Sequence, residues 1–177
     1  LDEIQTGIGR TGKMFALEHD DVVPDVLTLG KGLGGGFPVG AFLCTETVAA
    51  TVKPGDHGGT YVGNPLACAA ASAVLEVVQE EKLVERVAKL GARLSGRLRA
   101  FAEANPGVTR GVRGRGLLVG LVLADAEAAA ALSKRALGAG VLVNVTAGNV
   151  LRLFPALNIP EDELFGALET VLGLIAG

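Results

Sequence analysis

The sequence predicts an α/β fold in which short strands alternate with helices. Short apolar runs bounded by Gly, Pro or Asp fill residues 1–62, two long helical patterns follow, and strand and helix patterns alternate again over 108–177. Such alternation is typical of layered α/β architecture. With 177 residues, 49% of them hydrophobic, the chain can bury one large core or two small ones.

The first region carries three strand-like runs. They cover Val22 to Val26 around Pro24, Val26 to Leu29, and Val39 to Leu43. Each is bounded by residues that favour turns. We therefore expect short strands joined by tight loops.

Two helices are predicted next. Pro65 suits a first helical turn, and the run from Leu66 to Val78 is so rich in Ala, Leu and Val that we expect a helix buried on most faces. The second helix ends at Asn105-Pro106-Gly107. Its single apolar face is formed by Leu83, Val87, Leu90, Leu94, Leu98 and Phe101.

The last region predicts a small α/β layer. Strands are expected over Leu117 to Leu123, Val141 to Val145 and Val150 to Leu153, with a helix over Glu127 to Leu137. A final helix opens at Pro160, where three acidic residues suit the helix dipole. The basic cluster Arg110, Arg113 and Arg115 is interpreted as a solvated, Gly-rich loop rather than an RNA contact.

Composition excludes several classes of protein. The formal net charge of −3 argues against nucleic-acid binding, and no uninterrupted apolar stretch suggests a membrane span. Cys44 and Cys68 lie in different settings, as in a reduced cytoplasmic protein. His19 and His57 are far apart and lack a ligand cluster, so no metal is expected.

Lys31 stands between an apolar run and a glycine run, in the segment Thr28 to Pro38. Such a lysine can bind phosphate, form a covalent bond through its amine, or simply lie on the surface. The phosphate-loop interpretation is disfavoured, because the glycines mostly follow the lysine and no Ser or Thr succeeds it.

A second motif lies upstream, where residues 2–13 read Asp-Glu-Ile-Gln-Thr-Gly-Ile-Gly-Arg-Thr-Gly-Lys. Together with the Lys31 segment it resembles the class III (ornithine-type) aminotransferases, which have fold type I among pyridoxal 5'-phosphate (PLP) enzymes. The resemblance covers essentially the whole chain as the C-terminal part of such an enzyme. It implies the end of the large PLP-binding domain over 1–78 and the small C-terminal domain over 79–177. Because the family's N-terminal half is absent, we expect this truncated chain to be inactive alone.

The resemblance assigns roles near the cofactor. It implies that Lys31 forms the internal Schiff base and that Asp2 faces the pyridine nitrogen. A carboxylate there keeps the ring protonated, so that it can act as an electron sink. Gln5 is implied to lie near the ring oxygen, although a buried structural amide fits it too.

Two further segments match the family. In His57 to Ala67, Thr60 is implied to reach the cofactor phosphate across a dimer interface, which predicts a homodimer with shared active sites. In Thr146 to Leu157, Arg152 is implied to bind the substrate carboxylate. An internal carboxylate partner for this buried arginine is the alternative.

The implied reaction transfers the terminal amino group of N2-acetylornithine to 2-oxoglutarate, giving N-acetylglutamate 5-semialdehyde and glutamate in arginine biosynthesis. The partners would be small amino acids and 2-oxo acids. Alternative amino donors are ornithine, 4-aminobutyrate and succinyldiaminopimelate. A different alternative is a non-catalytic, dimerising fragment of such an enzyme.

Overall fold

A computed structural model describes all residues from 1 to 177. The chain forms two compact units, Leu1–Glu85 and Arg86–Gly177, which are described separately below. The division between them falls in the first turn of helix α3, seven residues beyond the end of the domain predicted over 1–78.

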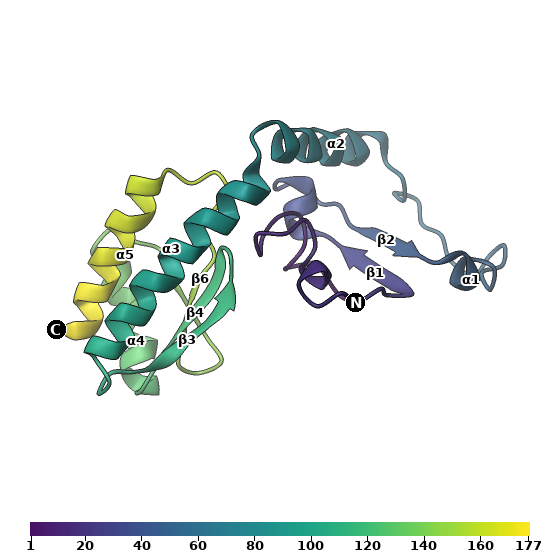
Figure 1. The fold of residues 1–177 in the computed structure, drawn as a ribbon. Helices are drawn as coiled ribbons and strands as arrows, with labels where there is room; N and C mark the ends of the chain where they lie inside the picture. Colours follow the sequence, from purple (N-terminus) through teal and green to yellow (C-terminus); the bar gives the residue numbers. More distant parts are fainter. The chain divides into compact units, whose positions relative to one another are not determined.

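The first unit is built around a two-stranded antiparallel sheet (Figure 1). Its elements are the 3-10 helix η1 (Ala16–His19), β1 (Val26–Leu29), the 3-10 helix η2 (Lys31–Gly34), β2 (Ala41–Cys44), α1 (Glu46–Ala49) and α2 (Pro65–Glu80). Leu29 pairs with Ala41 and Val26 with Cys44. The strands position the start of η2, and therefore Lys31, directly beyond the end of β1.

The expected strand around Pro24 does not form. Proline lacks the N–H that a ladder needs, and Val23 is 91% exposed, so β1 begins only at Val26. The strand predicted over Val39 to Leu43 is present but is shifted to Ala41–Cys44. Both differences shorten the sheet without changing the order of its elements.

Helix α2 begins where the sequence predicts. The side chain of Asn64 accepts hydrogen bonds from the backbone N–H groups of Leu66 (3.0 Å) and Ala67 (3.2 Å), and Pro65 occupies the first turn. The predicted burial on most faces is wrong for this chain, because only Ala67 and Val78 of the helix are buried. An apolar composition favours burial but supplies no covering element by itself.

The second unit packs three helices on one face of a four-stranded antiparallel sheet (Figure 1). Its elements are α3 (Leu83–Ala104), β3 (Thr109–Arg115), β4 (Leu118–Leu123), α4 (Ala126–Gly138), β5 (Asn144–Thr146), β6 (Val150–Leu153) and α5 (Glu161–Ala176). The strand order is β3-β4-β6-β5. Leu94, Leu98, Leu121 and Leu151 are fully buried in its core, and each such burial contributes about 1.5–3 kcal/mol.

The basic cluster predicted as a loop is in fact strand β3. Arg113 pairs with Gly120 and Arg115 with Leu118 in an antiparallel ladder, while Arg110 lies at a register shift between Thr109 and Gly111. Gly111 and Gly114 have positive φ angles of 135° and 112°, and glycines in a strand hide the alternation that reveals it in a sequence.

The strand predicted over Val141 to Val145 is also partly wrong, because β5 begins at Asn144. The N–H of Val141 instead donates to the carbonyl oxygen of Ala136 at the end of α4 (2.9 Å). This bond ties the residues just before β5 to the end of α4 rather than to the sheet.

No helix of the chain combines the length and apolar character that crossing a membrane requires.

Candidate cofactor and carboxylate sites

Asp2 and Lys31 are brought towards one end of β1. Asp2 forms a parallel bridge with Thr28, so the N-terminal segment runs beside β1 in the same direction. The N–H of Glu3 donates to the carbonyl oxygen of Thr28 (2.9 Å) and secures this register. Lys31 follows Thr28 by three residues, and the side chains of Asp2 and Lys31 are both exposed.

The Asp2 carboxylate is oriented by two donors. Its Oδ1 accepts the backbone N–H of Ile4 at 2.9 Å and the hydroxyl of Thr28 at 3.4 Å. Its Oδ2 has no hydrogen-bond partner within the chain. A held carboxylate with one unengaged oxygen can accept a hydrogen bond from a protonated ring nitrogen, so it fits the pyridine of PLP.

Lys31 opens η2 with a positive φ angle of 45°, which is uncommon for a residue other than glycine. Strained backbone of this kind concentrates at functional sites. The ammonium group of Lys31 has no hydrogen-bond or ion-pair partner within the chain. The turn is held in place by buried Leu33, while Gly35 lets α2 approach: a Cβ there would lie 2.8 Å from Cγ2 of Val74.

Glu3 is a residue to which the sequence assigns no chemical role, and the structure gives it a structural one. Its side chain is 3% exposed. It accepts a hydrogen bond from the N–H of Leu17 (2.8 Å) and another from the hydroxyl of Thr6. Because consecutive side chains of an extended segment face opposite ways, Glu3 anchors the segment from inside while Asp2 faces outward.

The other two predicted cofactor residues of the first unit lie in different surroundings. Gln5 is half-buried, and its amide has no hydrogen-bond partner within the chain. Thr60 is exposed in the turn before α2 and lines a hollow of about 470 Å³ together with Gly40 and Asn64. Neither Asp2 nor Lys31 lines this hollow.

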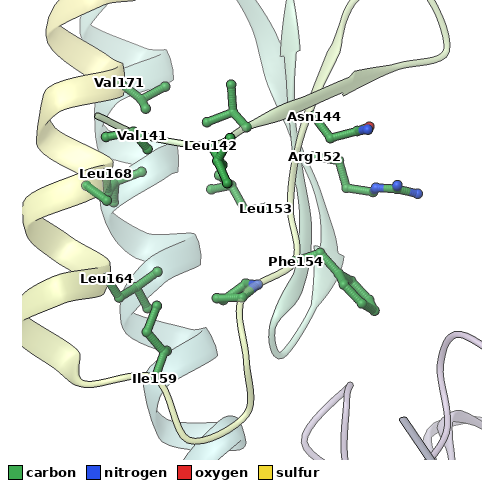
Figure 2. A pocket seen from close by; sticks show the side chains of 13 residues that line it. Val141, Leu142, Asn144, Arg152, Leu153, Phe154, Ile159, Leu164, Leu168 and Val171 are labelled. Atoms are coloured by element: carbon green, nitrogen blue, oxygen red, sulfur yellow. The ribbon is translucent and has the colours of Figure 1, made fainter. Parts of the chain in front are cut away.

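Arg152 lies on β6 in the second unit, opposite Gly120 of β4 and Asn144 of β5. Its Nε atom is buried without a hydrogen-bond partner, and no carboxylate of the chain pairs with its guanidinium. It borders a cavity of about 390 Å³ whose other walls are mostly apolar and include Leu164 and Leu168 of α5 (Figure 2). The guanidinium points away from α5 and the apolar walls (Figure 2), and such an unpartnered planar cation can bind a planar anion on that side.

Arg86 holds the segment that follows β6, and the sequence does not single it out. Its guanidinium donates to the carbonyl oxygen of Leu157 (2.6 Å) and to that of Ile159. These carbonyls are 71 and 73 residues away in the sequence, so no local pattern could reveal the contact. The segment lines the same cavity as Arg152 through Phe154, Pro155 and Ile159.

The lysine, the oriented carboxylate and the glycine-rich turn are the groups that a PLP aldehyde and its ring nitrogen require. The residues present therefore fit this cofactor. The fold is that of the C-terminal part of a fold type I, PLP-dependent transferase.

The family is shown by comparison with known proteins. The family model described as "Aminotransferase class-III" matches residues 1–173. The chain thus belongs to the class III aminotransferases.

Its curated relatives include enzymes of two names. The chain is 49% identical over 173 residues to the acetylornithine aminotransferase of Methanothermobacter thermautotrophicus, covering 98% of this chain and 43% of that protein. It is 44% identical over 176 residues to an ornithine aminotransferase of Bacillus cereus, covering 99% of this chain and 43% of that protein. The chain thus spans less than half the length of these relatives.

Solved structures agree on the fold. Acetylornithine aminotransferase from Elizabethkingia anophelis matches with a TM-score of 0.87 and 42% identity, over 98% of this chain and 44% of that one. Ornithine aminotransferase from Toxoplasma gondii matches with a TM-score of 0.92 and 38% identity, over 99% and 42%. An S-selective transaminase from Arthrobacter matches with a TM-score of 0.91 at 29% identity, over 99% and 43%.

Proposed function

We propose that the chain is the C-terminal part of a PLP-dependent enzyme that transfers the terminal amino group of N2-acetylornithine to 2-oxoglutarate. The products are N-acetylglutamate 5-semialdehyde and glutamate, which places the enzyme in cytoplasmic arginine biosynthesis. In this proposal residues 1–78 complete the large cofactor-binding domain and residues 79–177 form the small domain. The observation that carries it is the oriented carboxylate of Asp2 beside the strand that leads to Lys31.

Lys31 and Asp2 have separate tasks. PLP, when bound, supplies the electron sink that stabilises negative charge at the substrate Cα. Lys31 would hold the cofactor through its amine and, once released, would serve as the base that takes the proton from the substrate Cα. Asp2 would keep the ring nitrogen protonated through the oxygen that has no partner in the chain.

Gln5 and Thr60 are proposed to complete the cofactor contacts. The unpartnered amide of Gln5 suits the ring oxygen, which can accept a hydrogen bond. The exposed hydroxyl of Thr60 suits the phosphate of a cofactor that is held by a second subunit. Thr60 lines a hollow to which Lys31 does not contribute, so the two residues are proposed to serve different cofactor molecules. The active enzyme would accordingly be a homodimer with shared sites.

Arg152 is proposed to bind a substrate carboxylate. Its guanidinium has no internal partner, and a planar fork of donors matches a planar carboxylate. Its Nε is buried without a partner, and a buried donor is costly unless an acceptor meets it, which favours a ligand for Arg152.

The choice of amino donor rests on sequence similarity to relatives of known name. The 49% identity to an acetylornithine enzyme exceeds the 44% identity to an ornithine enzyme, and the Thr-Ala-Gly-Asn-Val run at residues 146–150 agrees with the former. Initial rates with N2-acetylornithine, ornithine, 4-aminobutyrate and succinyldiaminopimelate test the choice. A clear preference for any of the other three would refute it.

A non-catalytic, dimerising member of the same fold is the second candidate. Mixing the purified full-length protein with PLP separates the two. A stable dimer without imine absorbance favours the non-catalytic candidate.

Lys31→Ala in the full-length protein tests the cofactor assignment. Reduction with borohydride should trap PLP on the unmodified protein and should trap none on the variant. Lys13→Ala is the matched control, since Lys13 is an exposed lysine of the neighbouring motif and should leave the adduct intact. A retained adduct on another lysine in Lys31→Ala would end the assignment.

A further inference from the structure

Four residues form one row across the sheet of the second unit. Arg113 of β3 pairs with Gly120 of β4, Gly120 pairs with Arg152 of β6, and Arg152 pairs with Asn144 of β5. Two arginines therefore flank a glycine at the same level of the sheet.

The row belongs to the face of the sheet that the helices leave open. The adjacent positions on three strands, Val112, Leu121 and Leu151, contribute to the core beneath the helices. Alternate side chains of a strand face opposite ways, which directs the row outward. Figure 2 shows Asn144 and Arg152 pointing away from α5 on this side.

Gly120 leaves room for the two arginines to approach one another. A Cβ at this position would lie 3.7 Å from Cγ of Arg113 and 2.8 Å from Cγ1 of Val150. The Cγ atom of Arg113 thus lies beside Gly120 of β4, the strand between β3 and β6. Neighbouring strands are about 4.8 Å apart, so two such intervals separate the backbones of Arg113 and Arg152.

The charges on this face are unbalanced. Arg113, Arg115 and Arg152 lie on this face, and the four strands contain no Asp or Glu. The guanidinium groups of Arg113 and Arg152 have no hydrogen-bond or ion-pair partner within the chain, and Nε of Arg152 is buried. Two like charges that share a site are stabilised when an anion binds between them.

We propose that Arg113 and Arg152 together form one carboxylate-binding site, in which Arg113 is a further substrate-binding residue. The inference rests on the proposed function, since the ligand is the carboxylate of the 2-oxo acid or amino acid that Arg152 receives. Arg113 provides a second guanidinium group, which donates further hydrogen bonds to that carboxylate and places a second positive charge beside it. Asn144, on the other flank of Arg152, is placed to add a neutral donor.

The experiment measures anion binding directly, with glutarate as a non-reacting dicarboxylate, by calorimetry on the full-length, PLP-loaded protein. Arg113→Gln should weaken glutarate binding about tenfold and raise the KM for 2-oxoglutarate by a similar factor. The effect on KM should be larger than the effect on kcat, because Arg113 does not act on the reacting atoms. Binding should also become less sensitive to salt.

Arg115→Gln is the matched control. Arg115 lies two residues further along the same face, is exposed, and likewise has no side-chain partner. Its replacement should change neither glutarate affinity nor KM. Equal behaviour of Arg113→Gln and Arg115→Gln overturns the proposal.

A second variant decides the matter if Arg113→Gln does not fold. Arg113→Lys keeps the charge but loses the planar fork, so glutarate should bind about threefold more weakly; unchanged affinity would count against the site.

The outcomes also separate this inference from the proposed reaction. Glutarate binding that depends on Arg113 in a protein without transaminase activity refutes only the reaction, whereas normal turnover with binding independent of Arg113 refutes only the site.

Discussion

Thr28 and Asp2 lie side by side in a parallel bridge, and the hydroxyl of Thr28 is 3.4 Å from Oδ1 of the Asp2 carboxylate. Asp2 is thereby attached to the strand that ends one residue before Gly30 and two before Lys31. Two backbone hydrogen bonds hold the same register: Glu3 N–H donates to the carbonyl oxygen of Thr28 (2.9 Å), and Thr28 N–H donates to that of Leu1 (3.0 Å). The position of the carboxylate relative to Lys31 therefore depends on how the N-terminal segment pairs with β1.

Asp2→Asn removes the negative charge of the side chain and keeps its size and its capacity to accept a hydrogen bond. The amide oxygen can still accept the N–H of Ile4, but it no longer keeps a ring nitrogen protonated. In the full-length protein we expect borohydride still to trap PLP on Lys31, while turnover falls about 100-fold or more, as when a preorganised electrostatic group is removed. Asp20→Asn, at an exposed position in the same unit, should be neutral. Unchanged turnover in Asp2→Asn would remove Asp2 from the site.

Arg86→Ala should loosen the segment after β6. The change leaves the carbonyl oxygens of Leu157 and Ile159 without their donor, at a cost of about 1–3 kcal/mol. Amide hydrogen exchange over residues 154–160 should accelerate, and urea should unfold the variant at a lower concentration.

The control for Arg86 is Arg93→Ala on the same helix. Arg93 pairs with Glu161 through side chains that are 59% and 49% exposed, and exposed pairs contribute about 1 kcal/mol or less. Its exchange over 154–160 should match that of the unmodified protein. Equal acceleration in both variants would show that Arg86 does not hold the segment specifically.

The pair between Arg97 of α3 and Glu169 of α5 should make stability depend on pH. Nε and one terminal nitrogen of Arg97 donate to the two carboxylate oxygens, each at 2.6 Å. The side-chain hydrogen bond from Arg97 lowers the pKa of Glu169 from its ordinary value of 4.5. The carboxylate form therefore stabilises the fold above 4.5, and this stabilisation is lost as the pH falls through the lower pKa of the folded state.

Glu169→Gln should consequently lower the free energy of unfolding at pH 7 by less than about 1 kcal/mol, because the side chains of the pair are 38% and 52% exposed. The difference should vanish in strong acid and shrink in high salt. A double-mutant cycle with Arg97→Gln, measured by urea unfolding at both pH values, isolates the pair. A coupling energy that is the same at both pH values would contradict the assignment.

Several elements could be predicted because their signals are local. Asn64-Pro65 starts α2, the apolar stripe from Leu83 to Phe101 defines α3, and the acids after Pro160 open α5. Each of these patterns is contained within a few turns of chain. The same locality explains the errors at β3, whose glycines conceal a strand, and at Val141, whose N–H bonds to the preceding helix.

The amino-acid sequence by itself indicated the family, the four long helices α2, α3, α4 and α5, and a set of candidate site residues, because each depends on residue types at short spacing. These candidates are Lys31, Asp2, Gln5, Thr60 and Arg152. Only the tertiary structure decided that Asp2 lies beside Thr28, that Arg86 holds Leu157 and Ile159, and that Arg113 shares a row with Arg152. The physical reason is that strand register and helix-to-loop hydrogen bonds join residues dozens of positions apart, and those partners are chosen when the whole unit packs.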